Sequence, residues 1–397
     1  MKFSPVMDKI NESGTIKYFS RVQKLLAEGS EIISLTIGEL SDMTPGVIKD
    51  AGIQAIRDNH TRYTLNEGTL KLRAVVADKY NKDYNSDYSP DHVLVSNGSK
   101  QCLFNILFAL CGAGNEVIIF SPYYPSYPEM VKLTGADPVF VETSIVNNFQ
   151  PDLKSLEHAI SRKTRAIIIN SPNNPTGAIY DEATFDSIRK IASDNSLILI
   201  FDEIYESLVF PPFKYINPLS IFPDMSGYSV FVSGVSKSFA MTGWRLGYCL
   251  GPLELIKKAS LVQSHITNNA SSISQFASVT AIESGKELTD IFVPELIEKR
   301  NLVTKKLQSI AGLKFFEPRG AFYFFIDVTE YLGKTCDKTR ILTSEDLALF
   351  LLEQFGVAVV PGEYFGAFGF LRLSFAGSKK SLENGSDLLI KGLKSLN

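Results

Sequence analysis

The sequence contains few cysteines and few histidines. Its 397 residues include four of each, and the cysteines lie far apart without a CxxC pair. This scarcity argues against a disulfide scaffold and against a zinc site built from Cys/His clusters, so we expect no metal. Three of the cysteines, Cys102, Cys111 and Cys249, lie in apolar runs, which is typical of reduced core residues in a cytosolic protein.

Long hydrophobic runs and tracts of one charge are also absent. No apolar run reaches the roughly 18 residues of a membrane-spanning helix, and the N-terminal residues carry acidic groups where a signal peptide needs an apolar segment. The chain has 40 basic and 43 acidic residues, a net charge of -3 and no basic tail. We therefore expect a soluble, cytoplasmic protein that binds neither a membrane nor nucleic acid.

A nicotinamide-binding motif is missing as well. No GxGxxG follows an early strand with an acidic residue about 20 positions further on, which argues against a nicotinamide-dependent oxidoreductase. The chain also shows no internal repeat and no low-complexity segment.

Short apolar runs alternate with helical patterns as far as about residue 250. Several of these runs are apolar throughout, which is typical of strands that are covered on both faces. This pattern predicts an α/β domain with a mainly parallel sheet and helices on both sides. The predicted strands span residues 92–96, 116–120, 138–141, 166–170, 197–201, 229–232 and 246–250.

The two ends of the chain have a different texture. A helix (15–28), a strand (32–37) and a loop (38–45) are predicted before the α/β part. After residue 252 helical patterns dominate to about residue 311. Mixed elements follow: strands at 313–316 and 321–328, a polar loop at 333–339, a helix at 345–354, a β pair at 357–360 and 370–375, and a final helix. We expect a large domain of residues 46–290 and a smaller α+β domain of residues 291–397, to which residues 1–45 also contribute.

The stretch SGVSKSFAMTGWRLGYCLG, residues 233–251, carries the first candidate chemistry. Lys237 lies between two predicted strands among small and apolar neighbours, and partial burial would lower its pKa and free a nucleophilic amine. The guanidinium of Arg245 suits a phosphate or a carboxylate. An amine beside an anion site indicates a carbonyl cofactor with a phosphate, which is pyridoxal phosphate (PLP). The alternative is that both are solvated turn residues.

Polar residues follow other predicted strands, where ligands of an open α/β sheet gather. The turn Gly98-Ser99-Lys100 opens a predicted helix, whose free N–H groups suit a phosphate, although such a turn is often only a cap. Asn174 lies in the loop SPNNPTG, where a fixed amide can hydrogen-bond a ring oxygen; a plain turn is the alternative.

Further candidates have similar positions. Asp202 ends a buried strand, where a carboxylate needs a cation such as a protonated pyridine nitrogen; helix capping is the alternative. Tyr205 follows in the same segment and could bond the ring oxygen. Tyr124 could stack on the cofactor or pack a loop. Arg372, inside an alternating strand, needs either a carboxylate ligand or a structural ion pair.

Together these residues resemble the fold-type I PLP enzymes, and within them the class I aminotransferases. The closest resemblance is to the bacterial-type aspartate aminotransferases of subgroup Ib. The stretches SPNNPTGAIY, FDEIYE, SKSFAMTGWRLGY and FLRLSFA carry it, in this order, and it extends from about residue 16 to the last helix. The resemblance implies a fold-type I α/β PLP transferase with a large, mainly parallel-sheet domain and a smaller α+β domain.

The resemblance also implies roles for residues around the cofactor ring. Lys237 would be the Schiff-base lysine, which also moves the proton at the substrate α-carbon. Asp202 would pair with the pyridinium, Asn174 and Tyr205 would bind the ring oxygen, and Tyr124 would stack on the ring. By the same resemblance, the catalytic residues are Lys237, Asp202 and Tyr205.

The phosphate and the substrate are assigned in the same way. The phosphate cradle would comprise Gly98, Ser99, Lys100, Ser236 and Arg245, and Tyr63 would reach the phosphate of a neighbouring subunit, which implies a homodimer with shared active sites. The substrate site would comprise Gly38, Lys100, Tyr124, Asn174 and Arg372. In it Arg372 would clamp the α-carboxylate and Lys100 would approach the distal carboxylate of a dicarboxylic substrate.

The chain departs from the family pattern at two places. Many relatives have serine or threonine three residues before the lysine, where this chain has Gly234, so Ser233 or Ser236 is the candidate for the missing hydroxyl. The loop of residues 38–45 lacks the first proline and the phenylalanine of the common GEPDFxTP pattern. Because this loop borders the substrate, the departure bears on specificity.

The resemblance favours reversible transfer of an amino group between L-aspartate and 2-oxoglutarate in a ping-pong cycle. An aminotransferase for aromatic or other amino acids is an alternative, since Tyr18, Phe19, Phe322 and Phe365 could line an aromatic pocket. A β- or γ-eliminating lyase would use the same lysine and aspartate. A cofactor-binding regulator is less favoured, because such proteins usually carry a DNA-binding extension and this chain is not basic.

Overall fold

The computed structural model describes residues 1–12, 14–336 and 339–396, and a seven-stranded sheet lies at its centre. The strand order is β2-β8-β7-β6-β5-β3-β4, and only β8 runs antiparallel to its neighbours. This confirms the predicted mainly parallel sheet. The strands are β2 (Val93–Ser96), β3 (Glu116–Ser121), β4 (Asp137–Glu142), β5 (Thr164–Asn170), β6 (Ile198–Asp202), β7 (Ser229–Gly234) and β8 (Gly247–Leu250).

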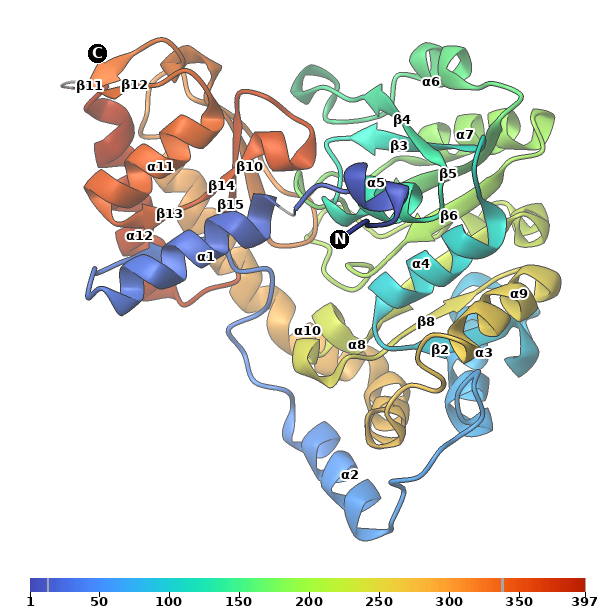
Figure 1. Cartoon of the computed structure of the whole chain (residues 1–397). Helices are drawn as coiled ribbons and strands as arrows, with labels where there is room; N and C mark the ends of the chain where they lie inside the picture. The colour runs from blue at the N-terminus through green and yellow to red at the C-terminus, as the bar shows by residue number, and fades with distance from the viewer. Residues whose placement is uncertain (13, 337–338, 397) are drawn as a thin grey trace.

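Helices cover both faces of this sheet (Figure 1). Along β5, Ile167 and Ile169 belong to one buried cluster and Ala166 and Ile168 to another, because successive side chains of a strand point to opposite faces. Both faces of the sheet are therefore buried from solvent, which explains why its strands are continuous apolar runs in the sequence. The surrounding helices are α2 (Gly46–Arg57), α3 (Leu70–Tyr84), α4 (Ser99–Leu110), α5 (Ser126–Leu133), α6 (Leu153–Ala159), α7 (Glu182–Asp194) and α9 (Leu253–Ser264).

A second, antiparallel sheet of order β14-β15-β10-β9 lies beside the first, with a short parallel pair formed by β1 and β13. The N-terminal helix packs here: Tyr18 donates to the carbonyl of Ala348 at 3.2 Å, and Figure 1 shows α1 next to α11 and α12. The elements are α1 (Gly14–Ala27), β1 (Ile33–Ser34), β9 (Lys314–Phe316), β10 (Tyr323–Asp327), α11 (Ser344–Phe355), β13 (Val357–Ala358), β14 (Val360–Pro361), β15 (Phe370–Ser374) and α12 (Lys379–Lys394).

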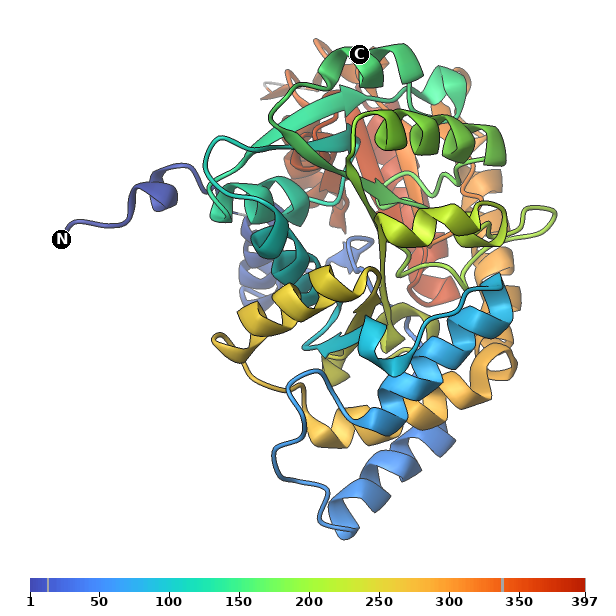
Figure 2. The same ribbon diagram turned by 90° about the vertical axis from the view of Figure 1, so that its right-hand side faces the viewer.

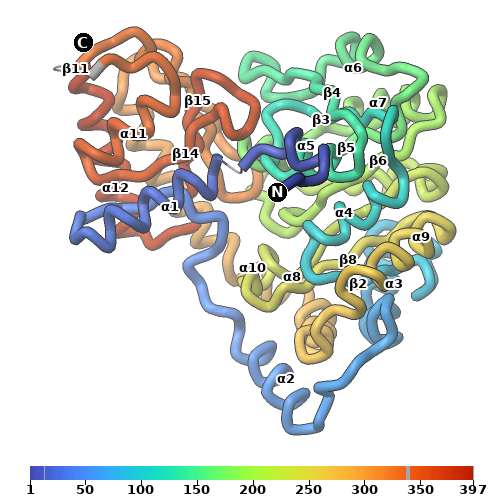
Figure 3. The backbone as a smooth tube through the Cα atoms, in the orientation of Figure 1, coloured from blue at the N-terminus to red at the C-terminus, as the bar shows by residue number. Residues whose placement is uncertain are grey.

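One long helix, α10 (Ser272–Leu307), contacts α2 and α3 as well as α12. Its backbone leaves helical geometry at Gly285, where φ is 45°. The division between residues 290 and 291 falls inside this helix, and the domain limits stay a prediction. The backbone trace shows α2 at the far end of the molecule from α11, with extended chain on both sides of it (Figure 3). Within the described ranges, no helix is long and apolar enough to cross a membrane.

Two predicted elements differ from the structure. The strand expected at residues 32–37 is limited to β1, because beyond Leu35 the chain turns toward a cavity, where the carbonyl of Thr36 accepts a hydrogen bond from Arg372. The polar loop expected at residues 333–339 instead contains a small antiparallel pair, β11 (Thr335–Cys336) with β12 (Thr339–Arg340). Hydrogen bonds between Gly333 or Lys334 and Ile341 extend this pair. Residues 337–338 of that prediction lie outside the described residues.

Candidate active site

A cavity of about 770 Å³ lies where the predicted strand-end residues meet. It collects side chains from the loops after β3, β5, β6 and β7, from the start of α4, and from β15 and the loop after β1. These elements are far apart in sequence, and the shared carboxyl edge of the sheet brings most of them together. The predicted residues that line it are Gly38, Ser99, Lys100, Tyr124, Asn174, Asp202, Tyr205, Ser236, Lys237, Arg245 and Arg372.

Lys237 belongs to the single helical turn α8 (Val235–Ser238), directly after β7. Its Nζ donates a hydrogen bond of 2.6 Å to the carbonyl oxygen of Gly38. Burial lowers the pKa of Lys237 to about 8, with Glu39 opposing this shift and Arg245 adding to it. A solvated turn lysine is therefore the wrong interpretation, and a substantial fraction of this amine is neutral and nucleophilic near pH 8.

Asp202 ends β6 and is 5% exposed. Burial raises the pKa of its carboxyl group to about 6, although hydrogen bonds from the Tyr127 hydroxyl at 2.7 Å and the backbone N–H of Ile204 at 3.3 Å oppose the shift. No helix begins at Asp202, so the capping interpretation is wrong. Within the described chain no Lys or Arg forms a salt bridge with Asp202, and a cation in the cavity would favour its charged form.

Arg372 lies buried in β15 and has no carboxylate partner among the described residues. Its two terminal nitrogens donate to the side-chain oxygen of Asn174 at 3.1 Å and to the carbonyl of Thr36 at 2.9 Å. The guanidinium lies 4.4 Å from the ring centre of Tyr323 and 4.8 Å from that of Phe365. Neutral acceptors and aromatic rings leave its positive charge uncompensated, so an anionic ligand suits it better than a structural ion pair.

The oxygen and nitrogen atoms near Asn174 form a connected set. The backbone N–H of Asn174 donates to the side chain of Asn170 at 2.8 Å, and Asn170 in turn donates to the carbonyl of Asp202 at 2.9 Å. The hydroxyls of Tyr205 and Tyr323 lie 3.0 Å apart. These contacts fix the loop after β5 to the end of β6.

The start of α4 forms a close contact with Arg245. Gly98 has φ of 92°, and a Cβ atom there would lie 2.7 Å from Nη2 of Arg245. A Cβ at Gly247 would lie 2.2 Å from the backbone nitrogen of Ser99. Only glycine permits this approach, which places a guanidinium beside a helix N-terminus, an arrangement suited to a phosphate. Arg245 is exposed, as the solvated interpretation expected, but it lines the cavity.

The departure at Gly234 has a steric reason. A Cβ at this position would lie 2.9 Å from Cα of Gly247 on the neighbouring strand. Of the two hydroxyls considered as replacements, Ser236 lines the cavity, whereas Ser233 donates to the carboxylate of Glu206 at 3.2 Å.

Three predicted residues do not line the cavity. Gly98 lies behind Arg245, and Tyr63 is 88% exposed, so its role toward a neighbouring subunit stays a prediction. Phe322, one of four aromatic residues named for the alternative aromatic pocket, is fully buried, whereas the adjacent Tyr323 lines the cavity. Adjacent residues of an extended chain point to opposite sides.

Some cavity residues were missed from the sequence. Tyr127 lies 5.5 Å, ring to ring, from Tyr124, and its spacing of three residues from Tyr124 was the available signal. Glu39, from the loop after β1, accepts a hydrogen bond from Thr242 and lines the cavity. Nothing in the local sequence indicated that contact across about 200 residues.

The model of the family "Aminotransferase class I and II" matches residues 30–388. The chain belongs to this family. This aminotransferase is 40% identical over 401 aligned residues to a bifunctional aspartate aminotransferase and glutamate/aspartate-prephenate aminotransferase from Petunia hybrida, with 100% of this chain and 84% of the relative covered. It is 37% identical to an aspartate/prephenate aminotransferase from Nitrosomonas europaea, with 96% and 97% covered.

Solved structures give the same result for the fold. An aspartate aminotransferase from Rhizobium meliloti superimposes with a TM-score of 0.96 at 35% identity, with 100% of both chains covered. An aspartate aminotransferase from Thermus thermophilus with maleate superimposes with a TM-score of 0.91 at 34% identity, covering 99% of this chain and 100% of the other. The aminotransferase therefore has the predicted fold-type I α/β architecture.

Proposed function

We propose that this aminotransferase transfers the amino group of L-aspartate to 2-oxoglutarate with PLP as its cofactor. One observation carries the proposal: among the described residues, a single cavity holds an amine with a lowered pKa, a buried carboxylate without a salt-bridge partner, and a buried arginine without a salt-bridge partner. A carbonyl cofactor with a basic ring nitrogen and an amino-acid substrate would supply the complementary groups. The names of the relatives from Petunia hybrida and Nitrosomonas europaea support the choice of aspartate.

The donor set fits PLP. Ser99, at the N-terminus of α4, and Arg245 would hold the phosphate, and the missing Cβ of Gly98 leaves room for that guanidinium. Asp202 would face the ring nitrogen, and Tyr124 would stack on the ring. Asn174 and Tyr205 would bind the ring oxygen and Ser236 would support the phosphate, as the resemblance implies. When bound, PLP draws electron density from the substrate α-carbon and so makes its proton removable.

Three protein residues would have separate roles in the reaction. Lys237 would bind the cofactor aldehyde through its neutral amine and, once the substrate amine has displaced it, carry the proton from the substrate α-carbon. Arg372 would hold the α-carboxylate with its fork of donors, close to Gly38. Asp202 in its charged form would keep the ring nitrogen protonated.

Lys100 supports a dicarboxylic substrate. Its Nζ lies 5.4 Å from the ring centre of Tyr124, at the cavity wall, and the side chain is otherwise exposed. With Arg372 it provides two positive points for the two carboxylates of aspartate or 2-oxoglutarate.

A second acceptor, prephenate, is favoured by a separate observation. Two relatives carry prephenate in their names, and the cavity has a volume of about 770 Å³, with Ile16 and Phe19 of α1 in its wall. Prephenate has two carboxylates and an apolar ring, so the same cationic points and this wall would both be used. An aromatic amino acid would use this wall and Arg372 but not Lys100.

A homodimer is part of the proposal. Tyr63 is 88% exposed, and the N-terminal residues extend away from the rest of the chain, with Met1, Phe3 and Met7 exposed (Figure 2). Exposed apolar side chains on a projecting segment are typical of contacts with a second subunit. Light scattering should give twice the chain mass, and a monomer with full activity would contradict the shared site.

The composition supports a cytoplasmic location, which fractionation of cells would test.

The decisive experiment is borohydride trapping of the loaded enzyme followed by peptide mapping. We expect the label on Lys237 and no turnover by Lys237→Ala, whereas Lys257→Ala, an exposed lysine of α9, should keep wild-type activity. Amino donors tested against 2-oxoglutarate and prephenate would then identify the substrate pair. Label on another residue, or release of ammonia and pyruvate in place of an aminated partner, would overturn the proposal.

A further inference from the structure

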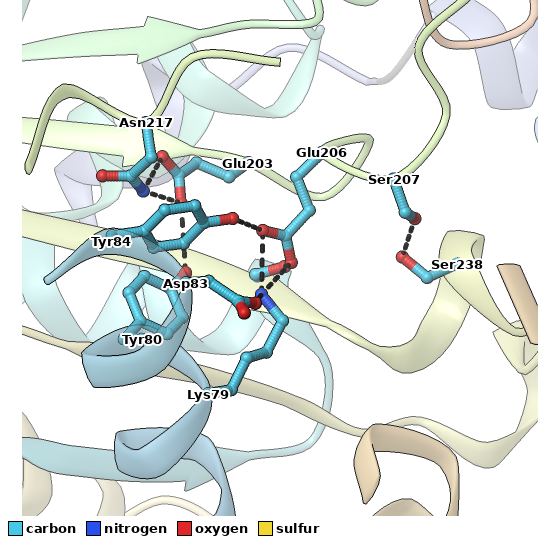
Figure 4. Close-up of polar contacts among 10 residues, drawn as sticks. Lys79, Tyr80, Asp83, Tyr84, Glu203, Glu206, Ser207, Asn217 and Ser238 are labelled. Atoms are coloured by element: carbon cyan, nitrogen blue, oxygen red, sulfur yellow. Dashed lines mark hydrogen bonds and ion pairs between the residues drawn. The ribbon is translucent and has the colours of Figure 1, made fainter. Parts of the chain in front are cut away.

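A buried polar cluster joins α3 to the chain after β6, and its residues do not line the cavity (Figure 4). Within FDEIYE, Asp202 and Tyr205 line the cavity, whereas Glu203 and Glu206 do not. Glu203 is 2% exposed and the side chain of Glu206 is 8% exposed. Two acidic side chains in the interior require donors, and Lys79, Tyr80 and Tyr84 of α3 provide them.

Glu206 accepts four hydrogen bonds within this cluster. Its carboxylate accepts hydrogen bonds from Lys79 at 3.1 Å to each oxygen, from the Tyr84 hydroxyl at 2.8 Å and from Ser233 at 3.2 Å. Lys79 also lies 3.8 Å from Asp83, one turn along α3. Glu206 therefore joins three elements: α3, β7 and the turn after β6.

Glu203 occupies the adjoining position. It accepts hydrogen bonds from the Tyr80 hydroxyl at 3.0 Å and from Asn217 at 2.9 and 3.1 Å. Burial, and then the nearby charge of Glu206, raise the pKa of Glu203 to about 8. The Lys79 amine bonds to both oxygens of Glu206.

The same two chain segments carry the proposed catalytic groups. Ser233 of β7 lies four residues before Lys237 and donates to Glu206, and Ser207 donates to Ser238 of α8 at 2.6 Å, so the turn after β6 is bonded to the chain before and after the lysine. Figure 4 shows this serine pair beside the carboxylate cluster. The segments of residues 202–207 and 233–238 thus face the cavity on one side and the cluster on the other.

We propose that Glu206, held by Lys79 and Tyr84, is a positioning residue that fixes the separation between Asp202 and Lys237. It touches neither substrate nor cofactor. Through the turn after β6 and through Ser233, it sets the two segments on which the carboxylate and the amine lie. The inference rests on the roles proposed above for Asp202 and Lys237. Small displacements of paired catalytic groups have large effects on rate. We therefore expect replacement of Glu206 to lower kcat.

The test compares variants of the PLP-loaded enzyme. Glu206→Gln keeps the shape of the side chain but removes the partner of Lys79, and Lys79→Met/Glu206→Gln is the charge-neutral double variant. Three readouts are needed: kcat and KM for aspartate, the pH midpoint of the visible absorbance of bound cofactor, and the melting temperature. The matched control is Lys71→Met/Glu283→Gln, which removes an exposed ion pair of 2.5 Å that also joins α3 to another helix, α10.

We expect kcat to fall about tenfold in both Glu206 variants, with KM changed about twofold or less. The pH midpoint should move downward in Glu206→Gln, because one negative charge is lost beside Lys79 and, among the described acidic residues, only Asp83 stays within 3.8 Å of it, and return toward wild type in the double variant while kcat stays low. The control should leave all three readouts near wild type. Wild-type kcat in either Glu206 variant, measured well below its melting temperature, would mean that the cluster only stabilises the fold and would overturn the proposal.

Two additions keep the test decisive. If Glu206→Gln does not fold, Tyr84→Phe removes one hydrogen bond to Glu206 without changing the charge. This variant should lower kcat about threefold. An unchanged kcat in it would also refute the positioning role.

Borohydride trapping of the wild-type enzyme in the same series separates the two proposals. Label away from Lys237 would refute the proposed function, whereas label on Lys237 with unchanged Glu206 variants would refute only the positioning role.

Discussion

Replacing Tyr127 by phenylalanine removes one oxygen atom from the environment of Asp202. The Tyr127 hydroxyl donates to the Asp202 carboxylate at 2.7 Å, and burial raises the pKa of this tyrosine well above its usual value, so it acts as a donor at every relevant pH. With this hydrogen bond present, the pKa of Asp202 is about 6. Its loss removes a contact that stabilises the charged form of Asp202 more than the neutral form.

The size of the effect follows from the type of bond. A hydrogen bond to a charged group contributes about 1.5–3 kcal/mol, and one pH unit corresponds to about 1.4 kcal/mol. The pKa of Asp202 should therefore rise by about one to two pH units in Tyr127→Phe, to between about 7 and 8. The substitution keeps the buried ring, so we expect the variant to fold.

Binding of an unreactive cofactor analogue measures this pKa. Deoxypyridoxine phosphate lacks the aldehyde, so its affinity for the cofactor-free protein does not depend on bond formation at Lys237. A charged Asp202 favours the analogue with a protonated ring nitrogen, and protonation of the carboxylate removes that attraction. Affinity for wild type should fall as the pH drops through about 6. In Tyr127→Phe the fall should begin about one to two pH units higher.

A control and a refuting result complete the experiment. Tyr180 is also fully buried but does not line the cavity, so Tyr180→Phe should keep the wild-type pH profile. The ring nitrogen of the free analogue titrates identically in the three experiments, so only differences between the proteins report on Asp202. Superimposable profiles for wild type and Tyr127→Phe would show that the hydroxyl does not set the charge of Asp202.

Three further predictions concern other parts of the cavity. The rate of PLP attachment to cofactor-free protein, followed by visible absorbance, should rise with pH up to about 8, where Lys237 becomes neutral, and then level off; a rise that continues to about pH 10 would match an ordinary lysine. Arg372→Ala should raise KM for all amino-acid substrates alike, whereas Lys100→Ala should selectively weaken the dicarboxylic ones, and equal losses on alanine and aspartate in the Lys100 variant would remove the assigned specificity role. Gly98→Ala places a Cβ 2.7 Å from Nη2 of Arg245 at a φ of 92°, so PLP affinity, measured by titration, should fall about tenfold. The control Gly112→Ala places its Cβ where no atom lies within 4 Å, and this variant should bind PLP normally.

Much of the fold was predictable because it depends on local patterns. Continuous apolar runs indicated strands covered on both faces, and the structure confirms a mainly parallel sheet between two layers of helices. The strand at residues 32–37 was predicted too long, since its pattern could not show that Thr36 turns to accept a hydrogen bond from Arg372. That contact spans 336 residues.

The candidate site was predictable for a related reason. Parallel strands end at one edge of a sheet, so polar residues that follow several strands must meet there, and the predicted lysine, aspartate and asparagine line one cavity. Tyr127 and Glu39 escaped prediction because their partners, Asp202 and Thr242, are distant in sequence. Phe322 was named in the alternative aromatic pocket and Tyr323 was not, because aromatic composition does not tell which side of a strand a residue faces.

The sequence by itself determined the residue types, their order along the chain and the alternation of strands and helices, since these follow from hydrophobic period and short motifs. Only the tertiary structure decided the pKa values and the charge partners of the side chains in the cavity. A lysine with a pKa of about 8, a carboxyl group with a pKa of about 6 and a buried arginine without an acidic partner among the described residues arise from burial and from neighbours brought together by the fold. Desolvation and the distance between charges belong to the folded molecule, so no local pattern contains them.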